Sequence, residues 1–339
     1  MNSIFSFSLQ DLGLTEALSQ YSVPASQEST VADLILSHLN SKPGFIKHKR
    51  SLTKNRDIHS LYSNAVHTVV AKGAPLDIFI TAFTPKVTNP STTNGHTLPD
   101  MADLLSLIHL HLVAKGIREI YDYGFRFIVA YKGRTYQPLF NWSNDTVKDT
   151  FDTLLTLRDA AESIVGIRNV VTFVDLEDLI EKEGQLFQKK ILHEMIEVQN
   201  AYNDKVPYTI RKIDSWKRDF HKAINPAAFD TTEKIDSFLH QYALYFRSLK
   251  NIQYQGGEHG IGICNSFPQC LMATIRGIDE QLSIQLSPFF RFHSHQRLIA
   301  KTSNVSWKMM KWCDMEKSSS AFSPVYVKEF SYPFYFDKK

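Results

Sequence analysis

The chain has 339 residues, of which 43% are hydrophobic and 12% aromatic, which is enough for one large α/β domain with an insertion or for two domains. Its 38 basic and 35 acidic residues give a net charge of +3, and this balance argues against a nucleic-acid partner, which usually requires a concentrated basic surface. No stretch approaches the roughly 18 apolar residues of a membrane span, and the first 21 residues lack a secretory signal pattern, so no membrane partner is expected.

The three cysteines, at positions 264, 270 and 313, cannot all pair with one another. Their spacing is also unlike that of a metal site. We therefore expect free thiols, which are typical of a reducing compartment, and hence a cytoplasmic protein.

Residues 1–70 predict an N-terminal helical segment. Thr30 has the position of a helix cap, and residues 58–70 have the composition of a helix that leads into the first strand. A basic run at residues 45–56 is interpreted as a solvated face, with a role in substrate binding as the alternative.

Residues 71–178 alternate between strand and helix patterns. Expected strands, rich in β-branched and aromatic residues, are 76–83, 125–131 and 168–174, and 134–140 is a further short candidate. Helical spacing of apolar residues marks 101–120 and 143–164, the first of which is expected to begin with the capping-box variant Thr97-x-x-Asp100. This alternation predicts an α/β fold with a Rossmann-like, mostly parallel sheet.

The rest of the chain divides into two parts. Residues 179–250 predict a helical insertion, in which the basic stretch 211–222 is expected to face solvent rather than RNA. Residues 251–339 return to β character and are expected to complete the core, with strand candidates at 261–264 and 281–286. The glycine-rich run 256–260 lacks the spacing of a dinucleotide-binding loop.

The polar loop at residues 84–97 leaves the first strand at its carboxyl end, where open parallel sheets bind their ligands. Lys86 offers a cation, while Asn89 and Ser91 offer hydrogen bonds. The N-terminus of the next helix favours an anion such as phosphate. An ordinary surface connection is the alternative interpretation, since loops are polar by default.

A second candidate group lies at residues 291–297. On a strand, His293 and His295 would face the same side as Arg291, where they could bind phosphate and transfer protons. A metal site and an ordinary surface both stay open, because imidazole suits zinc or iron but no third ligand is evident. His109 and His111 would point to different sides of a helix and are expected to be structural.

The α/β part carries a set of short motifs in a fixed order. They are Phe83, Lys86-Val87-Thr88-Asn89, Gly95, Leu98-Pro99-Asp100, a leucine-rich helix, Tyr121-Asp122-Tyr123-Gly124, a strand and Lys132-Gly133. Together they resemble the PvcA-type isonitrile (isocyanide) synthases, the family that also holds the fungal spore-wall dityrosine enzymes.

This resemblance implies an amino-acid isonitrile synthase of secondary-metabolite biosynthesis. Its substrates would be an amino acid, tyrosine or tryptophan, and ribulose 5-phosphate, with no metal and no cofactor. We expect catalytic roles for Lys86, Asp100 and His295, and substrate binding by the set Asn89, Ser91, Arg291 and His293. A homodimer is one assembly that the sequence allows.

Other motifs of that family are altered in this chain. Residues 281–285 and 305–308 keep the hydrophobic frame of the expected Arg-Leu-Ser-Ile-His and Thr-Pro-Trp-His motifs but lack the arginine and both histidines. Lys132 and Thr92 stand where an aspartate and a lysine are expected. Two alternatives follow. One is a catalytically altered relative that binds a phosphorylated metabolite or a protein partner, and the other is a metal-dependent enzyme centred on His293 and His295.

Overall fold

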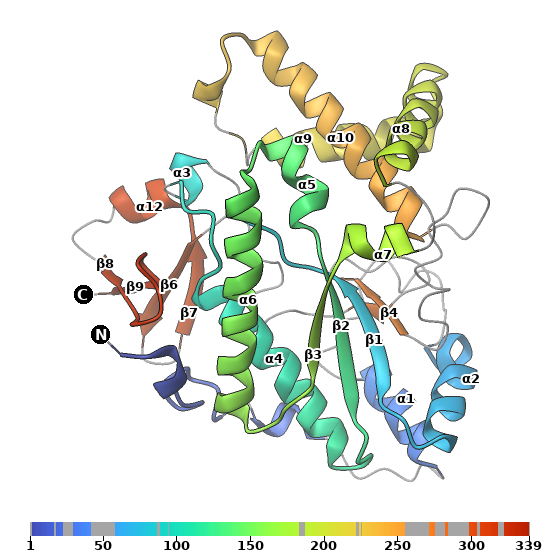
Figure 1. The fold of residues 1–339 in the computed structure, drawn as a ribbon, viewed down its shortest axis with the longest axis vertical. Helices are drawn as coiled ribbons and strands as arrows, with labels where there is room; N and C mark the ends of the chain where they lie inside the picture. The colour runs from blue at the N-terminus through green and yellow to red at the C-terminus, as the bar shows by residue number, and fades with distance from the viewer. Residues whose placement is uncertain are drawn as a thin grey trace.

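The structure is a computed structural model. It describes residues 2–16, 18–22, 30–41, 58–86, 89–93, 95–182, 187–221, 224, 226–254, 271–274, 282–283, 298–303, 306–317 and 322–338. A parallel sheet flanked by helices forms the centre, a smaller sheet lies to one side, and a layer of helices stands over one edge of the central sheet (Figure 1).

The central sheet has five strands in the order β3-β2-β1-β4-β5, all parallel. They are β1 (Leu76–Thr81), β2 (Phe125–Tyr131), β3 (Val171–Asp175), β4 (Leu271–Thr274) and β5 (Leu282–Ser283). The predicted α/β class and parallel sheet are confirmed. The strand candidate at residues 261–264 lies outside the described residues, and β4 was not predicted. In the sheet, β2 and β3 follow β1 on one side, whereas β4 and β5 lie on its other side. The order of the strands across the sheet therefore reverses between β1 and β4.

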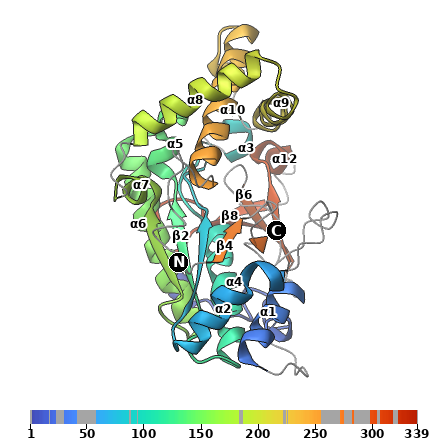
Figure 2. The same cartoon turned by 90° about the vertical axis from the view of Figure 1, so that its right-hand side faces the viewer.

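Two long helices connect the first three strands. α4 (Met101–Arg118) joins β1 to β2 and α6 (Asn144–Val165) joins β2 to β3, and the two helices pack against each other. α4 is buried along nearly its whole length, since the N-terminal segment also crosses it at Gly116. α1 (Val31–Ser41), capped by Thr30 as predicted, pairs with α2 (Ile58–Ala71), and Figure 2 shows this pair from its own side.

Two local predictions for residues 97–140 are wrong. Residues 134–140 belong to a helix, α5 (Gly133–Phe140), rather than to a strand, because Tyr136 and Phe140 lie one helical turn apart and pack together against the helical layer. The capping box of α4 is formed by Asp100 and Asp103, not by Thr97, so the helix begins at Met101.

The helical layer follows β3. It consists of α7 (Leu176–Lys182), α8 (Phe187–Asn203), α9 (Pro207–His221) and α10 (Thr232–Tyr254). The last three pack around a small apolar cluster of their own, formed by Val198, Ile213, Trp216, Ala243 and Leu244. The layer stands over the carboxyl ends of the central strands (Figure 1).

The smaller sheet has the order β7-β6-β9-β8, with strands β6 (Leu298–Ser303), β7 (Ser306–Met310), β8 (Phe322–Val325) and β9 (Tyr335–Lys338). A short helix, α12 (Trp312–Lys317), follows β7. Trp307 of β7 donates a hydrogen bond to the carbonyl oxygen of Leu12, and Phe334 accepts one from the backbone of Met101. These contacts join the smaller sheet, the N-terminal segment and α4 into one core. Among the helices of the described ranges, none is long and apolar enough to span a membrane.

Candidate functional site

The loop after β1 is fixed to the carboxyl edge of the sheet by its backbone. Phe83 adopts a positive φ of 63°, which is uncommon for a residue other than glycine, and its carbonyl oxygen accepts a hydrogen bond from the backbone of Lys132. Three residues later, the Lys86 backbone donates to the carbonyl oxygen of Thr97 at 2.7 Å. The loop therefore begins beside the point where the strand order reverses, which is where open α/β sheets bind ligands.

Lys86 belongs to a buried cluster of charges. Its ammonium nitrogen lies 2.8 Å from Asp100 Oδ2 and 3.8 Å from Asp103 Oδ2. Lys86 is 1% exposed, and the two aspartates are 2% and 3% exposed. The structure thus brings Lys86 and Asp100 into direct contact, and it places the lysine against two carboxylates of this chain rather than against solvent.

Both oxygens of Asp100 have a structural partner. Oδ1 accepts a hydrogen bond from the backbone of Ala102 at 2.9 Å, and Oδ2 pairs with Lys86. Burial raises the pKa of Asp100 to about 6, although the Lys86 ammonium opposes this shift. Burial therefore favours the neutral form of Asp100, and proton uptake by this carboxyl would weaken its ion pair with Lys86.

His96 and Tyr332 border the same cluster. Their rings are tilted with centroids 4.6 Å apart, and the Tyr332 hydroxyl donates to the carbonyl oxygen of Pro99 at 2.7 Å. Burial, with the nearby Lys86 charge, lowers the pKa of His96 to about 3, so its imidazole is neutral at physiological pH. Its Nε2 is buried and has no hydrogen-bond partner among the described residues.

Asn89 and Ser91 have different environments. Asn89 is 4% exposed, and its side chain donates to the carbonyl oxygen of Ile224 and accepts from the Ser91 backbone at 2.9 Å. It thereby begins the short helix α3 (Pro90–Thr93) and ties the loop to the chain that enters α10. Ser91 itself is exposed and can meet a ligand from solvent.

The other three predicted site residues, Arg291, His293 and His295, lie outside the described residues, so their place relative to Lys86 stays a prediction. Across the ranges that the structure covers, no group of three or more His, Cys, Asp or Glu side chains has an arrangement that could hold a metal ion. His109 and His111 are buried and face different partners, the Tyr21 hydroxyl at 2.7 Å and the Leu107 carbonyl oxygen at 2.7 Å, consistent with structural roles.

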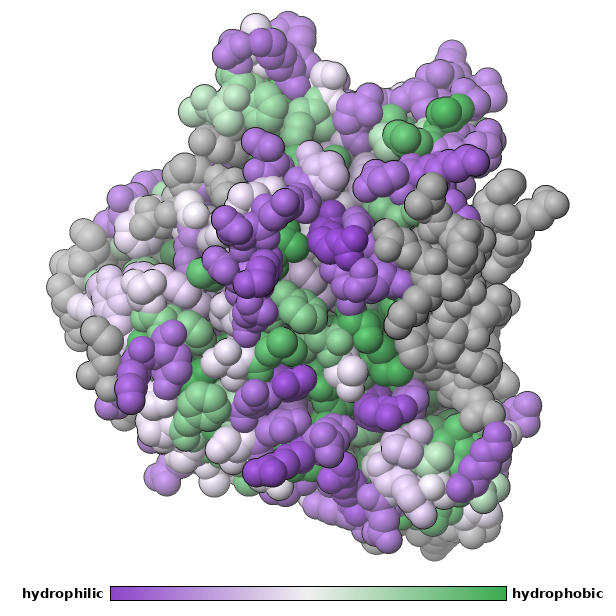
Figure 3. Space-filling model, viewed as in Figure 1, coloured by the Kyte–Doolittle hydropathy of each residue, from purple (hydrophilic) through white to green (hydrophobic). Residues whose placement is uncertain are grey.

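A cavity of about 610 Å³ lies further along the same sheet edge, at the carboxyl ends of β2 and β3. Its walls come from α5, α6 and α7, and in Figure 3 apolar surface is visible between hydrophilic residues of these helices. Its lining combines apolar rings with charges: Tyr131, Arg134, Gln137, Asn144, Val147, Lys148, Phe151, Phe173, Val174, Asp175, Asp178 and Leu179.

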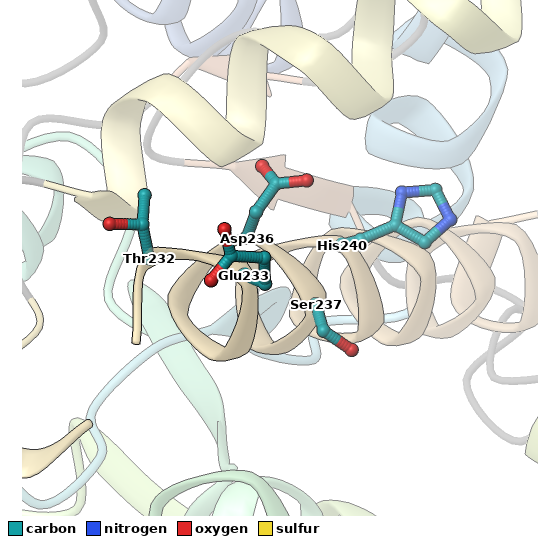
Figure 4. Close-up of a pocket in the computed structure, with 5 residues that line it drawn as sticks. All are labelled: Thr232, Glu233, Asp236, Ser237 and His240. Atoms are coloured by element: carbon teal, nitrogen blue, oxygen red, sulfur yellow. The ribbon is translucent and has the colours of Figure 1, made fainter. Parts of the chain in front are cut away.

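A more open depression of about 440 Å³ runs along α10. Its five lining side chains all come from that helix and spread along it, as Figure 4 shows. Asp236 pairs with Lys217 at 2.7 Å, and His240 is bonded to Gln199 at 3.0 Å. Since these groups serve contacts between helices, we place the candidate site at the sheet edge instead.

Sequence reasoning missed Asp103, His96 and Arg134. Asp103 could have been found from its position three residues after Asp100, which is the spacing of a capping box. His96 lies within the polar loop but carries no motif. Arg134 was assigned to a strand, and the correct helix places it beside the end of β3.

Comparisons with known proteins give three findings. The family described as pyoverdine/dityrosine biosynthesis proteins matches residues 66–256, more than half of the chain. An L-tyrosine isonitrile synthase from Xenorhabdus nematophila is 27% identical over 128 residues, which are 37% of this chain and only 38% of that relative's length. The crystal structure of the PvcA protein from Pseudomonas aeruginosa superposes with a TM-score of 0.72 at 16% identity, covering 91% of this chain and 100% of that one, and this likeness shows a shared fold.

Proposed function

Because the chain belongs to the pyoverdine/dityrosine biosynthesis protein family, we propose that it is an isonitrile synthase-like enzyme. The family match carries this proposal, and the relative named as an L-tyrosine isonitrile synthase supports it. The matched residues include both the loop after β1 and the lining of the cavity between α5 and α7. The part of the chain that carries the resemblance is therefore the part that holds the candidate site.

The proposed substrates are an aromatic amino acid, tyrosine or tryptophan, and ribulose 5-phosphate. The amino group would condense with the C2 ketone of the sugar phosphate. That carbon would become the isonitrile carbon, and phosphate and the sugar remainder would leave. Such a reaction needs a binding site for phosphate, groups that transfer protons, and a cavity for the amino acid.

The charged cluster of Lys86, Asp100 and Asp103 is suited to proton transfer rather than to permanent anion binding. Asp100 has a pKa of about 6, so it can accept a proton at a pH where an ordinary carboxyl would not. Protonation of Asp100 would weaken its ion pair with Lys86, whose ammonium nitrogen also lies 3.8 Å from Asp103 Oδ2. Asn89 and the exposed Ser91 would orient the substrate at the mouth of the loop, and Arg291, His293 and His295 keep their proposed roles in phosphate binding and catalysis.

The test is direct product detection. Purified full-length protein is incubated with ribulose 5-phosphate and either tyrosine, tryptophan or other amino acids, without added metal, and the isonitrile is measured by mass spectrometry. An established L-tyrosine isonitrile synthase serves as the positive control. We expect an isonitrile from an aromatic amino acid, and absence of product from every amino acid would refute the activity.

A second candidate function is that of a relative that has lost catalysis and binds a phosphorylated metabolite or a protein partner. One observation favours it. Trp307, in the run that corresponds to the altered Thr-Pro-Trp-His motif, is 5% exposed and bonded to the Leu12 carbonyl oxygen, so this position serves packing. Saturable binding of ribulose 5-phosphate without any isonitrile product would support this second function over the first.

A further inference from the structure

The cavity at the ends of β2 and β3 has the size and position of a ligand site. Its volume of about 610 Å³ lies within the usual range for small-molecule pockets, roughly 300–1,000 Å³. It is lined by the last residues of two parallel strands, Tyr131 of β2 and Asp175 of β3, and so lies outside the carboxyl edge of the sheet. The charged cluster around Lys86 does not line it, so the two form separate parts of this edge.

One side of the cavity is a series of aromatic rings. The rings of Tyr131 and Phe151 are 5.3 Å apart, and those of Phe151 and Phe173 are 6.3 Å apart in an edge-to-face arrangement. The ring centroids of Phe173 and Phe83 are 5.6 Å apart. Phe83 precedes Lys86 by three residues in the loop after β1. A flat apolar ligand group placed here would meet further rings at distances typical of aromatic pairs, and would lie next to that loop.

The lining also carries charges of both signs, two cations (Arg134 and Lys148) and two carboxylates (Asp175 and Asp178). The Arg134 guanidinium lies 2.5 Å from Asp178, 3.2 Å from Glu177 and 3.7 Å from Asp175, so three carboxylates share one cation. Lys148 also lines the cavity, but it is largely exposed and pairs with Asp152 on its own helix. Burial raises the pKa of Asp175, while the Arg134 charge and a hydrogen bond from the Glu177 backbone oppose this shift.

We infer that this cavity binds the amino-acid substrate, with the aromatic ring against Tyr131, Phe151 and Phe173 and the ammonium group against Asp175 and Asp178. The ligand carboxylate would lie near Arg134 and Lys148, the two cations of the lining. A ligand that satisfies apolar rings, carboxylates and cations together is an aromatic amino acid. This inference rests on the proposed function for the identity of the ligand as a substrate, whereas the combination of aromatic rings with charges of both signs is a property of the cavity itself.

The experiment measures binding separately from turnover. Isothermal titration of the full-length protein with L-tyrosine and L-tryptophan is compared with tyramine, which lacks the carboxylate, and with 3-(4-hydroxyphenyl)propionate, which lacks the amine. We expect the compound without the amine to bind at least ~tenfold more weakly than tyrosine, because a charge-assisted contact is lost. If 3-(4-hydroxyphenyl)propionate bound as tightly as tyrosine, the assignment of the ammonium group would be overturned.

Two variants and a matched control test the location. Asp178→Asn should weaken tyrosine binding by about tenfold, and Phe151→Leu should weaken it while leaving the binding of ribulose 5-phosphate unchanged. Asp159→Asn is the control, since Asp159 is similarly exposed and pairs with an arginine at 2.8 Å but lies outside the cavity. Thermal unfolding of each variant verifies that it is folded.

The outcomes separate this inference from the proposed function. Tyrosine binding that is weakened by Asp178→Asn, without isonitrile formation, would support the cavity and refute the activity. Isonitrile formation with the same KM for tyrosine in Asp178→Asn and in wild type would refute the cavity and keep the activity. If none of the aromatic amino acids and amines bound to the protein, the inference would be overturned.

Discussion

Replacement of Lys86 by methionine should destabilise the protein strongly, because it leaves two buried carboxylates without their cation. The ammonium lies 2.8 Å from Asp100, and at an effective dielectric constant of about 20 that separation corresponds to an attraction of about 6 kcal/mol. Desolvation of the charges offsets part of this attraction. From measured losses at buried ion pairs, we expect the free energy of unfolding to fall by about 3–5 kcal/mol at pH 8.

The loss should depend on pH. Without Lys86, the folded Lys86→Met variant should hold a proton on Asp100 up to a higher pH than wild type, whose Asp100 has a pKa of about 6. Between these two pKa values the folded variant binds one more proton than folded wild type. Its relative stability should therefore improve by about 1.4 kcal/mol for each pH unit of acidification in that range.

Urea unfolding at pH 8 and at pH 6.5, followed by circular dichroism, measures both effects. The double variant Lys86→Met/Asp100→Asn should recover part of the loss, because the second substitution removes one of the stranded carboxylates. Lys148→Met is the matched control, since its exposed pair with Asp152 at 3.6 Å contributes less than about 1 kcal/mol. A loss below about 1 kcal/mol for Lys86→Met, equal at both pH values, would refute the reasoning about the buried cluster.

Two further substitutions, at Gly116 and His111, test the packing of α4 against its surroundings, and Gly166 at the end of α6 provides a control. Gly116→Ala places a Cβ 1.8 Å from the Tyr21 carbonyl oxygen and should destabilise the protein by several kcal/mol. Gly166 has a φ of 72° but open space around it, so Gly166→Ala should cost only about 1 kcal/mol. Equal losses of unfolding free energy for the two variants in denaturant titrations would contradict the clash at Gly116. His111, whose pKa burial lowers to about 4, binds its proton less readily when folded, so stability should fall as the pH drops from about 6.5 towards 4, by up to about 3 kcal/mol from this residue. His111→Leu should reduce that acid sensitivity, and an unchanged pH dependence of the free energy of unfolding would show that His111 does not contribute to it.

The sequence predicted the central part of the fold because the signals there are local. The strands β1 and β2 are dense in β-branched and aromatic residues, and α4 and α6 have long apolar stripes. Short elements were harder to predict. α5 has only eight residues, so its two aromatic side chains one turn apart were not distinguished from a strand pattern, and β4 has four residues and no alternation.

The place of the loop after β1 was predicted, but the burial of Lys86 against two carboxylates was not. The carboxyl end of a strand follows from the order of elements, and this placed Lys86 and Asn89 at the correct edge of the sheet. The surroundings of Lys86 include the carboxylate of Asp103, which lies 17 positions later in the sequence. The orientation of the Asp103 side chain depends on the exact residue at which α4 begins. The cavity was not predicted because its lining comes from two strand ends and three helices that meet only in three dimensions.

The contact between the two ends of the chain constrains how the protein is made in the cell. Asn2 forms a β-bridge with Val327, and the Ile4 backbone donates to the Glu329 carboxylate at 2.9 Å, across 325 positions of sequence. A ribosome therefore releases the first residues long before their partners have been synthesised. Throughout that interval Ile4, which is fully buried in the finished molecule, has no completed core to enter and is open to other apolar surfaces, including those of neighbouring nascent chains. The N-terminal segment can therefore complete its packing only after residues 327–329 have emerged from the ribosome.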